Sequence, residues 1–371
     1  MLLSTILLVI LGLSTVPYGT IAVLVMIFGR KSTIKRDRSQ TISFTVFLPT
    51  FNEKTTIERK LEDLMTQTAF GKYDGEVLVY DCSTDGTRGI LDEYALRDRR
   101  IRVIEQRTRV GMARTFNEAM DEAKGDILVK TDSDSLSRSS ENLANLLEAF
   151  SANDHVGGVT GVCVNVGREG AFRGLMTRLQ IAETNLDSTV IAHSSSLVAI
   201  RRSALEKVDP DSMAEDTEEF LRVRRAGLRT IVDPSVVSVE RTPSAFFDRF
   251  QQKQRRAHGI IRALCQNADM LFNPRYGRYG MIVLPVNFFL LLISPSLLLV
   301  DLLGLIYLAF TIHLLVGLVG VVGLILILSC YLSRRPSWLV ATVDMQLFAL
   351  VGMLNLLLGV SNPTWKVYRD T

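Results

Sequence analysis

The sequence has little net charge and no paired cysteine motif. Its 371 residues carry a formal net charge of +3, so a nucleic-acid-binding role has no electrostatic support and no nucleic-acid partner is expected. The four cysteines, Cys82, Cys163, Cys265 and Cys330, show no Cys-x-x-Cys spacing. Scattered cysteines of this kind are typical of free thiols in a reducing compartment, not of a disulfide framework.

Charged side chains are absent from the first 29 residues, Met1 to Gly29. An apolar stretch of this length can cross a bilayer whose hydrocarbon core is about 30 Å thick. A cleaved signal peptide would carry positive charges in front of the apolar run, whereas here they follow it. The positive charges that follow are Arg30, Lys31, Lys35, Arg36 and Arg38. By the positive-inside rule, they place the middle of the chain in the cytoplasm.

Charges are also scarce in the last part of the chain. Residues 281–300 and 302–333 contain no Asp, Glu, Lys or Arg, and residues 337–360 contain only one. Each stretch is long enough to span a bilayer. Three spans would leave Lys366 and Arg369 outside, against the positive-inside rule, unless one apolar segment lies in the interface or re-enters.

The chain as a whole has a mixed composition. With 47% hydrophobic residues and a mean hydropathy of +0.22, it is too apolar for an ordinary soluble enzyme and too charged for a purely membranous protein. We therefore expect an integral protein of the cell membrane, with the lipid bilayer as a partner and the middle of the chain in the cytoplasm. The expected parts are an N-terminal transmembrane helix (residues 1–29), a cytoplasmic domain (41–264), an interfacial segment (265–280) and a C-terminal transmembrane region (281–361).

Apolar runs alternate with helical patterns through the middle of the chain. The expected strands cover residues 42–48, 76–80, 101–104, 127–131, 157–166, 196–200 and 236–239. Residues 245–265 follow as a basic, amphipathic helical stretch that leads towards the last apolar region. Strand and helix alternation of this kind predicts an α/β fold with a mostly parallel sheet flanked by helices.

The fourth expected strand delivers two carboxylates, because it is followed by Asp132-Ser133-Asp134. Open α/β sheets hold ligands at the carboxyl edge of their strands. Two carboxylates this close repel each other unless a cation lies between them. Magnesium takes one or two protein carboxylates and completes its shell with water and phosphate oxygens, so Asp132 and Asp134 are candidate ligands of Mg2+ or Mn2+. Ser-Asp-Ser clusters are also common in turns and caps, which is the alternative.

Two further strands end in polar turns. The first is followed by Pro49-Thr50-Phe51-Asn52-Glu53 and the second by a turn that runs from Asp81 to Thr87. Backbone amides and hydroxyls in such turns can line a nucleotide, while an Asp accepts from a base or ribose. Ordinary helix capping explains either turn alone about equally well.

Cations surround the helix start that follows the third strand. Arg107, Arg109 and Arg114 flank Gly111, and a helix N-terminus with nearby cations is suited to bind phosphate. For any one of these arginines, a solvated surface charge is the simpler interpretation.

Taken together, these segments resemble glycosyltransferase family 2, the inverting, nucleotide-sugar-dependent enzymes of the GT-A fold that include membrane polysaccharide synthases. Residues 49–53 are similar to the family's first-strand motif, and residues 80–87 to its Asp-Asp-Gly-Ser-Thr-Asp-Gly-Thr turn. Residues 111–117 match its Gly-Lys-Ala-x-Ala-Leu-Asn helix start, and residues 132–134 its metal-diphosphate motif. The resemblance covers residues 43–264.

The resemblance implies a role for each matched residue. Ala214-Glu215-Asp216 is similar to the family's Thr-Glu-Asp motif, which makes Asp216 the implied catalytic base, with Glu215 beside it. Asp81 is implied to contact the nucleobase. The other implied donor-binding residues are Pro49, Thr50, Asn52, Glu53, Arg109, Gly111, Arg114 and Asp132. An inverting transfer needs a base for the acceptor proton and a cation for the departing diphosphate, which Asp216 and a metal on Asp134 would supply. Without the family match, Glu215 and Asp216 would be interpreted as favourable charge in a helix's first turn.

A last motif departs from the family pattern. Gln252-Lys253-Gln254-Arg255-Arg256 occurs where the polysaccharide synthases carry Gln-x-x-Arg-Trp. Gln252 and Arg255 are implied to cover the diphosphate. Arg256 replaces the Trp that is thought to stack under the acceptor sugar in those synthases, and this replacement argues against processive elongation.

Three functions remain open from the sequence. The first is an inverting glycosyltransferase that moves a sugar from a UDP-sugar donor to a membrane-presented glycan, as a polysaccharide synthase does. The second is a transferase that adds a single sugar to a polyprenyl-linked or lipid acceptor. The third is a non-catalytic membrane scaffold or transporter with a degenerate GT-A domain. The sequence predicts no particular oligomeric state.

Overall fold

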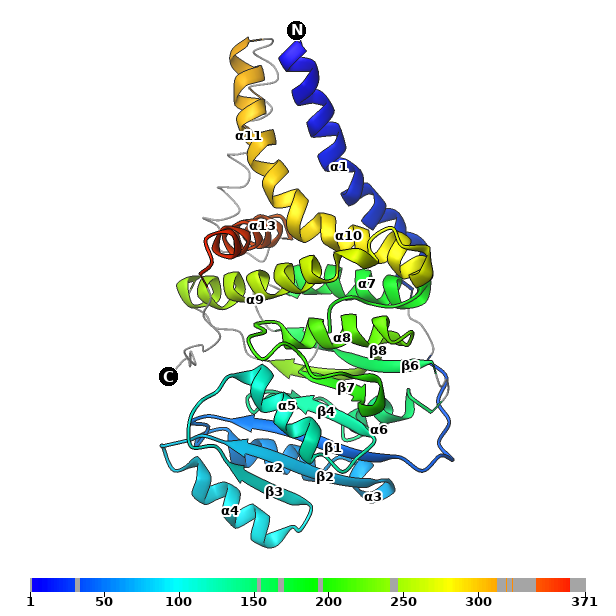
Figure 1. Ribbon diagram of the computed structural model, residues 1–371, viewed down its shortest axis with the longest axis vertical. Coiled ribbons are helices and arrows are strands. Elements are labelled where there is room, and N and C mark those ends of the chain that lie inside the picture. The colour runs from blue at the N-terminus through cyan, green and yellow to red at the C-terminus, as the bar shows by residue number, and fades with distance from the viewer. Residues whose placement is uncertain are drawn as a thin grey trace.

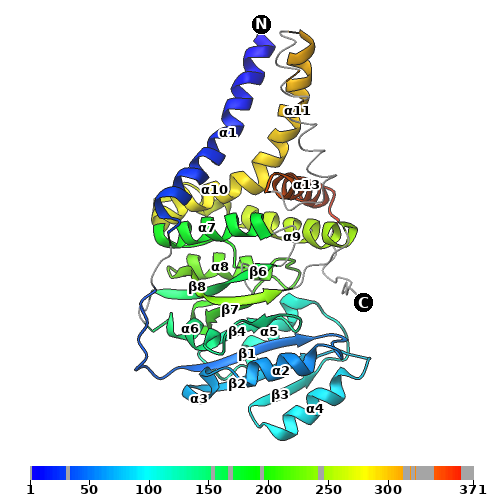
Figure 2. The ribbon, with the colours of Figure 1, turned by 180° about the vertical axis from the view of Figure 1, so that it is seen from behind.

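The computed structural model describes residues 2–30, 34–151, 155–165, 170–192, 196–240, 246–311, 318, 322 and 338–360. The described elements are stacked in layers along the long axis of the molecule (Figure 1). A body built on one sheet lies at one end, and two helices, α1 (Leu2–Phe28) and α11 (Ser294–Thr311), project from the other. A layer of helices separates the sheet from these projecting helices in both views (Figure 2).

The sheet has eight strands in the order β3-β2-β1-β4-β7-β6-β8-β5. The strands are β1 (Ser43–Thr50), β2 (Asp74–Asp81), β3 (Ile101–Glu105), β4 (Ile127–Thr131), β5 (Leu136–Ser137), β6 (Val156–Asn165), β7 (Leu197–Arg201) and β8 (Arg229–Glu240). The seven strands expected from the sequence are therefore present, and the two-residue strand β5 adds an edge that hydrophobic periodicity could not reveal.

The sheet is mixed instead of mostly parallel, although β6 and β8 pair in parallel as well as the first four strands of the order. Strands β3, β2, β1 and β4 are parallel neighbours. Strand β7, however, is inserted antiparallel to both β4 and β6, and β5 is antiparallel to β8. Helix α7 (Gly170–Leu186), which connects β6 to β7, contacts β6 and β8 of the sheet as well as α1 of the helical layer.

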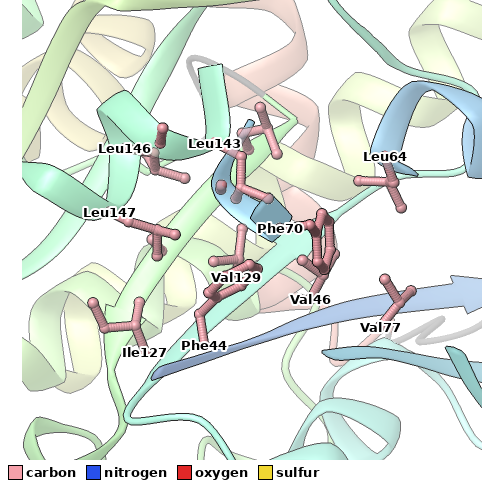
Figure 3. Packing of buried hydrophobic residues seen from close by; sticks show 14 of the residues in the cluster. Phe44, Val46, Leu64, Phe70, Val77, Ile127, Val129, Leu143, Leu146 and Leu147 are labelled. Atoms are coloured by element: carbon pink, nitrogen blue, oxygen red, sulfur yellow. The ribbon is translucent and has the colours of Figure 1, made fainter. Parts of the chain in front are cut away.

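One face of the sheet is buried under helices α2 (Ile57–Met65), α3 (Ala69–Lys72), α4 (Thr87–Arg97) and α6 (Asn142–Glu148). Phe44 and Val46 of β1 point into this core, together with Val129 of β4 (Figure 3). The rings of Phe44 and Phe70 pack with their centroids 5.1 Å apart. Apolar residues of α2 recur at the spacing of one helical face and lie fully buried here, as their periodicity predicted.

The opposite face is covered by α5 (Met112–Glu122) and α8 (Glu215–Arg225). Phe47 of β1 packs edge to face against Tyr80 of β2 and Phe116 of α5, with ring centroids 5.8 Å apart in each pair. Because β1 is covered on both faces, its sequence is almost continuously apolar, which is typical of a parallel strand inside an α/β domain. Its carboxyl end is therefore fixed rigidly beside those of β2 and β4.

The helical layer consists of α7, α9 (Phe246–Gln266), α10 (Leu284–Phe288) and α13 (Trp338–Leu357). Helix α9 confirms the expected amphipathic helix. α1 packs on α7 and α10 through Ile21, Leu24, Leu179 and Val286, and the Tyr18 hydroxyl lies 2.6 Å from the Ser294 hydroxyl of α11.

By length and composition, one helix of the described chain could cross a membrane, Tyr279–Leu297. Pro17–Phe28 and Asp344–Leu357 form shorter apolar helices. The expected span over residues 337–360 corresponds to α13, which lies along α9 and across the direction of α1 and α11 (Figures 1 and 2). Most of the expected span over residues 302–333 lies outside the described residues after Thr311.

A buried carboxylate connects α7 to α10. Glu183 is 3% exposed, and its two oxygens accept hydrogen bonds from Asn287 Nδ2 at 2.6 Å and Thr189 Oγ1 at 2.8 Å. Burial raises the pKa of Glu183 to about 7, although both hydrogen bonds oppose this shift. The folded protein therefore holds this proton more tightly than the unfolded chain, in which the pKa is near 4.5.

The free energy of unfolding should consequently depend on pH through Glu183. The stabilisation from the bound proton is complete below pH 4.5 and is lost as the pH rises through 7, which amounts to about 3 kcal/mol. Between pH 5 and pH 8, urea unfolding of a Glu183→Gln variant should show a smaller loss of stability than the wild-type protein. Glu206→Gln, at a side chain that is 93% exposed, is the control and should follow the wild type. Parallel pH profiles for Glu183→Gln and wild type would contradict the expectation.

Candidate active site

The polar turns after β1 and β2 lie side by side, because Thr50 and Asp81 are register partners at the ends of these strands. Thr50 Oγ1 and Ser83 Oγ donate to the same oxygen of Asp81, at 2.8 and 2.6 Å. Asp81 is only 2% exposed, so these two hydroxyls fix the direction of its carboxylate. Pro49 lies one residue earlier in β1, paired with Tyr80.

Asn52 and Glu53 hold the two turns together. The Asn52 side chain accepts a hydrogen bond from Thr84 N at 2.8 Å, and Glu53 N donates to Thr87 Oγ1 at 2.9 Å. The Glu53 carboxylate accepts from Thr56 Oγ1 at 2.6 Å, directly before α2 begins. Both predicted donor-binding residues thus have partners within the two turns, and neither α2 nor α4 has a side-chain hydrogen bond at its N-cap.

Arg109 reaches the same turns from the loop before α5. Its guanidinium lies 4.4 Å from the centroid of the Phe51 ring, a cation–π contact. Burial lowers the pKa of Arg109, and the neighbouring Cys82 opposes this shift. Gly111, with φ +95°, provides the left-handed backbone from which α5 starts. Arg114, in contrast, forms an ion pair with Asp211 at 2.9 Å, and both side chains are more than half exposed.

The Asp132-Ser133-Asp134 segment follows β4 with alternating burial. Asp132 and Asp134 are exposed, whereas Ser133 and Ser135 are buried, so both carboxylates face the same side. Among the described residues there is no group of three or more His, Cys, Asp and Glu side chains placed to hold a metal. Two exposed carboxylates fit a magnesium or manganese ion that takes its other ligands from water and phosphate.

A buried ammonium lies beneath this segment. Lys60 of α2 is 1% exposed, and its Nζ donates at 2.8 Å to both Thr131 Oγ1 and Ser135 O. Burial lowers the pKa of Lys60 to about 8, against the attraction of Asp63, Asp132 and Asp134. Lys60 therefore fixes the loop and adds positive charge under the two aspartates. Its position on an amphipathic helix gave no indication of this role.

A second buried lysine connects β4 to the start of α8. Lys130 Nζ lies 3.0 Å from Glu219 Oε1 and 3.5 Å from Glu215 Oε1. Burial alone would lower the pKa of Lys130, but Glu219, Glu215 and Asp216 together hold it above its ordinary value. Burial raises the pKa of Glu219, and the contact with Lys130 opposes this shift and favours the charged carboxylate. A lysine inside an otherwise apolar strand was the available sequence signal for this cluster.

Asp216 lies in the first turn of α8, within reach of cations from two elements. Its Oδ1 accepts a hydrogen bond from Thr217 N at 2.8 Å, and its Oδ2 lies 3.4 Å from Nη2 of Arg256. Lys130 of β4 interacts with it electrostatically. Lys130, which lies two residues before Asp132, therefore contacts the helix that carries the predicted catalytic base.

Arg255 connects the remaining groups. Burial lowers its pKa, Glu215 and Asp216 oppose this shift, and Arg256 and Arg109 add to it. These interactions place Arg255 between the α8 acids and the arginine that covers the nucleotide turn. Gln252 is half-buried one turn earlier on α9. The structure thus joins most of the predicted residues at one sheet edge and directs Arg114 elsewhere.

A glycine on α9 allows this close arrangement. A Cβ atom at Gly259 would lie 2.6 Å from the carbonyl carbon of Met213 and 2.8 Å from Ala214 N, in the turn directly before α8. Any larger residue at this position would push α9 away from the turn. Gly259 therefore keeps Arg255 and Arg256 next to Asp216.

Replacing Lys130 with Met should lower the free energy of unfolding by about 3–5 kcal/mol at pH 7, because it leaves the buried Glu219 without its cation. Adding Glu219→Gln to this variant should restore much of the loss in urea unfolding. Lys207→Met is a matched control, because it breaks an exposed ion pair with Asp121, and such pairs contribute about 0–1 kcal/mol. Equal losses for Lys130→Met and Lys207→Met would show that the buried cluster does not constrain the fold.

Comparisons with known proteins identify the family of the chain. The chain matches the family described as Glycosyl transferase family 2 over residues 45–209 and the one described as Glycosyl transferase family group 2 over residues 132–351. Glycosyltransferase AglD of Haloferax volcanii is 29% identical over 209 residues, which cover 52% of this chain and 32% of AglD. The match thus spans about a third of that relative.

The mannosyltransferase PcManGT from Pyrobaculum calidifontis, solved in complex with GDP-Man and Mn2+, is similar over the full length. Its TM-score is 0.80 at 25% identity, with 97% of this chain and 100% of that chain covered. This likeness confirms the expected α/β fold as GT-A-like, with a mixed instead of a mostly parallel sheet. The chain belongs to the family described as Glycosyl transferase family group 2.

Proposed function

We propose that this glycosyltransferase is an inverting enzyme, attached to the membrane with its sheet domain in the cytoplasm, that transfers one sugar to a membrane-presented acceptor. The observation that carries the proposal is the contact of Lys130 with the α8 acids. It holds the predicted base, Asp216, beside the strand that ends in Asp132 and Asp134. The proton acceptor, Asp216, and the metal-ligand candidates, Asp132 and Asp134, then lie at the same edge of the sheet.

The donor would bind across the carboxyl ends of β1, β2 and β4. Asp81, oriented by Thr50 and Ser83, would accept a hydrogen bond from the nucleobase. Asp132 and Asp134 would hold Mg2+ or Mn2+, which stabilises the negative charge of the departing diphosphate when it is bound. The PcManGT complex favours GDP-mannose as the donor over the UDP-sugar predicted from the sequence.

The transfer itself requires one proton to move. The oxygen of the acceptor hydroxyl forms a bond to the anomeric carbon, while the bond to the diphosphate oxygen breaks and leaves its electron pair on the diphosphate. Asp216 takes the hydroxyl proton on Oδ2, because Oδ1 accepts from Thr217 N. Arg109 and Arg255 supply positive charge on the diphosphate side.

Attachment to the membrane is supported by the apolar surface beyond the helical layer. Large apolar side chains of α1 and α11 are exposed, among them Met26 at 74% and Leu303 at 67%. Both helices project in the same general direction (Figures 1 and 2). We infer that α13 lies in the interface instead of spanning.

Asp216→Asn should lower kcat by about 10²–10⁴-fold, the usual contribution of a general base, because an amide cannot take the acceptor proton. Nucleotide binding should remain, since Thr50 and Ser83 hold the carboxylate of Asp81. Asp211→Asn is the control, because Asp211 pairs with exposed Arg114 shortly before α8. Initial rates of nucleotide release with acceptor measure this effect. Unchanged rates in Asp216→Asn would favour the non-catalytic scaffold or transporter.

Product length separates the two enzymatic alternatives. We expect membranes that contain the protein to add a single labelled sugar from GDP-mannose or a UDP-sugar to a lipid that is extracted into organic solvent. The reason is that Arg256 replaces the Trp on which a growing chain would stack. Chromatography of the labelled product measures how many sugars have been added. A ladder of long, water-soluble products would instead identify a polysaccharide synthase.

A further inference from the structure

The acceptor side of the proposed site carries a guanidinium next to the base. Arg256 Nη2 lies 3.4 Å from Asp216 Oδ2. The Arg256 side chain is 39% exposed, whereas the Asp216 side chain is 10% exposed. Arg256 is therefore the outer member of the pair and the one that an entering acceptor meets first.

Asp216 can take a proton only on an oxygen that is accessible to the acceptor. Oδ1 accepts from the backbone of Thr217, which belongs to the same helix turn. Oδ2 faces Arg256. A guanidinium at this oxygen stabilises the carboxylate and makes it a weaker base, so an acceptor that moves Arg256 also raises the basicity of Asp216.

Other cations lie near the α8 acids. Lys130 is within 3.5 Å of Glu215 and Glu219, and Arg255 interacts electrostatically with Asp216. Arg256 differs from these cations because it contacts Asp216 Oδ2 directly and its side chain is exposed.

On the basis of the proposed function, we propose that Arg256 selects an acceptor that carries an anionic phosphate or carboxylate group beside the attacking hydroxyl. Binding of this group draws the guanidinium from Asp216 Oδ2, so the base becomes available when the correct acceptor is bound. The hydroxyl proton then moves to Oδ2 as the new bond to the anomeric carbon forms and the diphosphate leaves with its electron pair.

Matched acceptors test this inference. Three acceptors share the same octyl chain and differ in the charge on or beside the sugar. They are a neutral octyl glycoside, an octyl uronide with a carboxylate, and a sugar joined to octanol through a phosphodiester. Values of kcat/KM are measured for the wild type and for Arg256→Gln and Arg256→Lys. The wild type should prefer an anionic acceptor, and the uronide and phosphodiester arms identify which anion it is.

Arg256→Gln should lower kcat/KM for the anionic acceptor about 10–100-fold, the effect of losing a hydrogen bond to a charged group, and leave the neutral acceptor unchanged or improved. Arg256→Lys should retain part of the preference. Arg262→Gln is the control on the same helix, because Arg262 bonds Asp209 at 2.6 Å outside the site, and it should keep the wild-type preference. Thermal unfolding midpoints of all variants report whether each one is folded.

Two results would overturn the inference. One is equal use of neutral and anionic acceptors by the wild type, and the other is an equal loss on all three acceptors in a folded Arg256→Gln protein. Both leave the proposed function intact, because sugar transfer is still observed. If the wild type consumes no GDP-mannose or UDP-sugar with any acceptor, the proposed function itself fails.

Discussion

The ammonium of Lys130, buried in the sheet, is the charge that joins the two halves of the site. One half is the edge formed by β1, β2 and β4, which carries Asp81 and the Asp132–Asp134 pair. The other half is the start of α8, which carries Glu215, Asp216 and Glu219. Because Lys130 is surrounded by the α8 carboxylates at 3.0–3.5 Å, neither half can shift without leaving a buried charge uncompensated.

Helix α9 extends this constraint to the apolar end of the molecule. Gly259 lets it pack on the turn before α8, while Arg256 faces Asp216. On its other side it meets α13, where Gln254 bonds Asn355 and the ring of Phe250 packs against Phe348 at 5.6 Å. Helix α9 thus connects the reacting groups to the layer from which α1 and α11 project (Figure 1). An acceptor held in a bilayer would approach the base along this helix.

The sequence predicted the parts of this structure that depend on local pattern. Strand positions followed from apolar runs, and the Asp132–Asp134 pair followed from its place after a buried strand. Strand direction did not follow, because an apolar run gives the position of a strand and not its direction in the sheet, as the antiparallel β7 shows. The buried lysines were also missed. Lys60 gave no signal on its amphipathic helix, and Lys130 gave only its place inside an apolar strand, because the partners of both come from tertiary contacts.

The central claim is that residues distant along the chain, at positions 81, 134 and 216, serve one nucleotide-sugar site. An experimental structure with Mn2+ and GDP tests it most directly. We expect the nucleobase beside Asp81 and the diphosphate on a metal held by Asp132 and Asp134. The side of the diphosphate on which the sugar would lie should face Asp216. A nucleotide bound away from these strand ends, or with its diphosphate directed away from Asp216, would contradict the account.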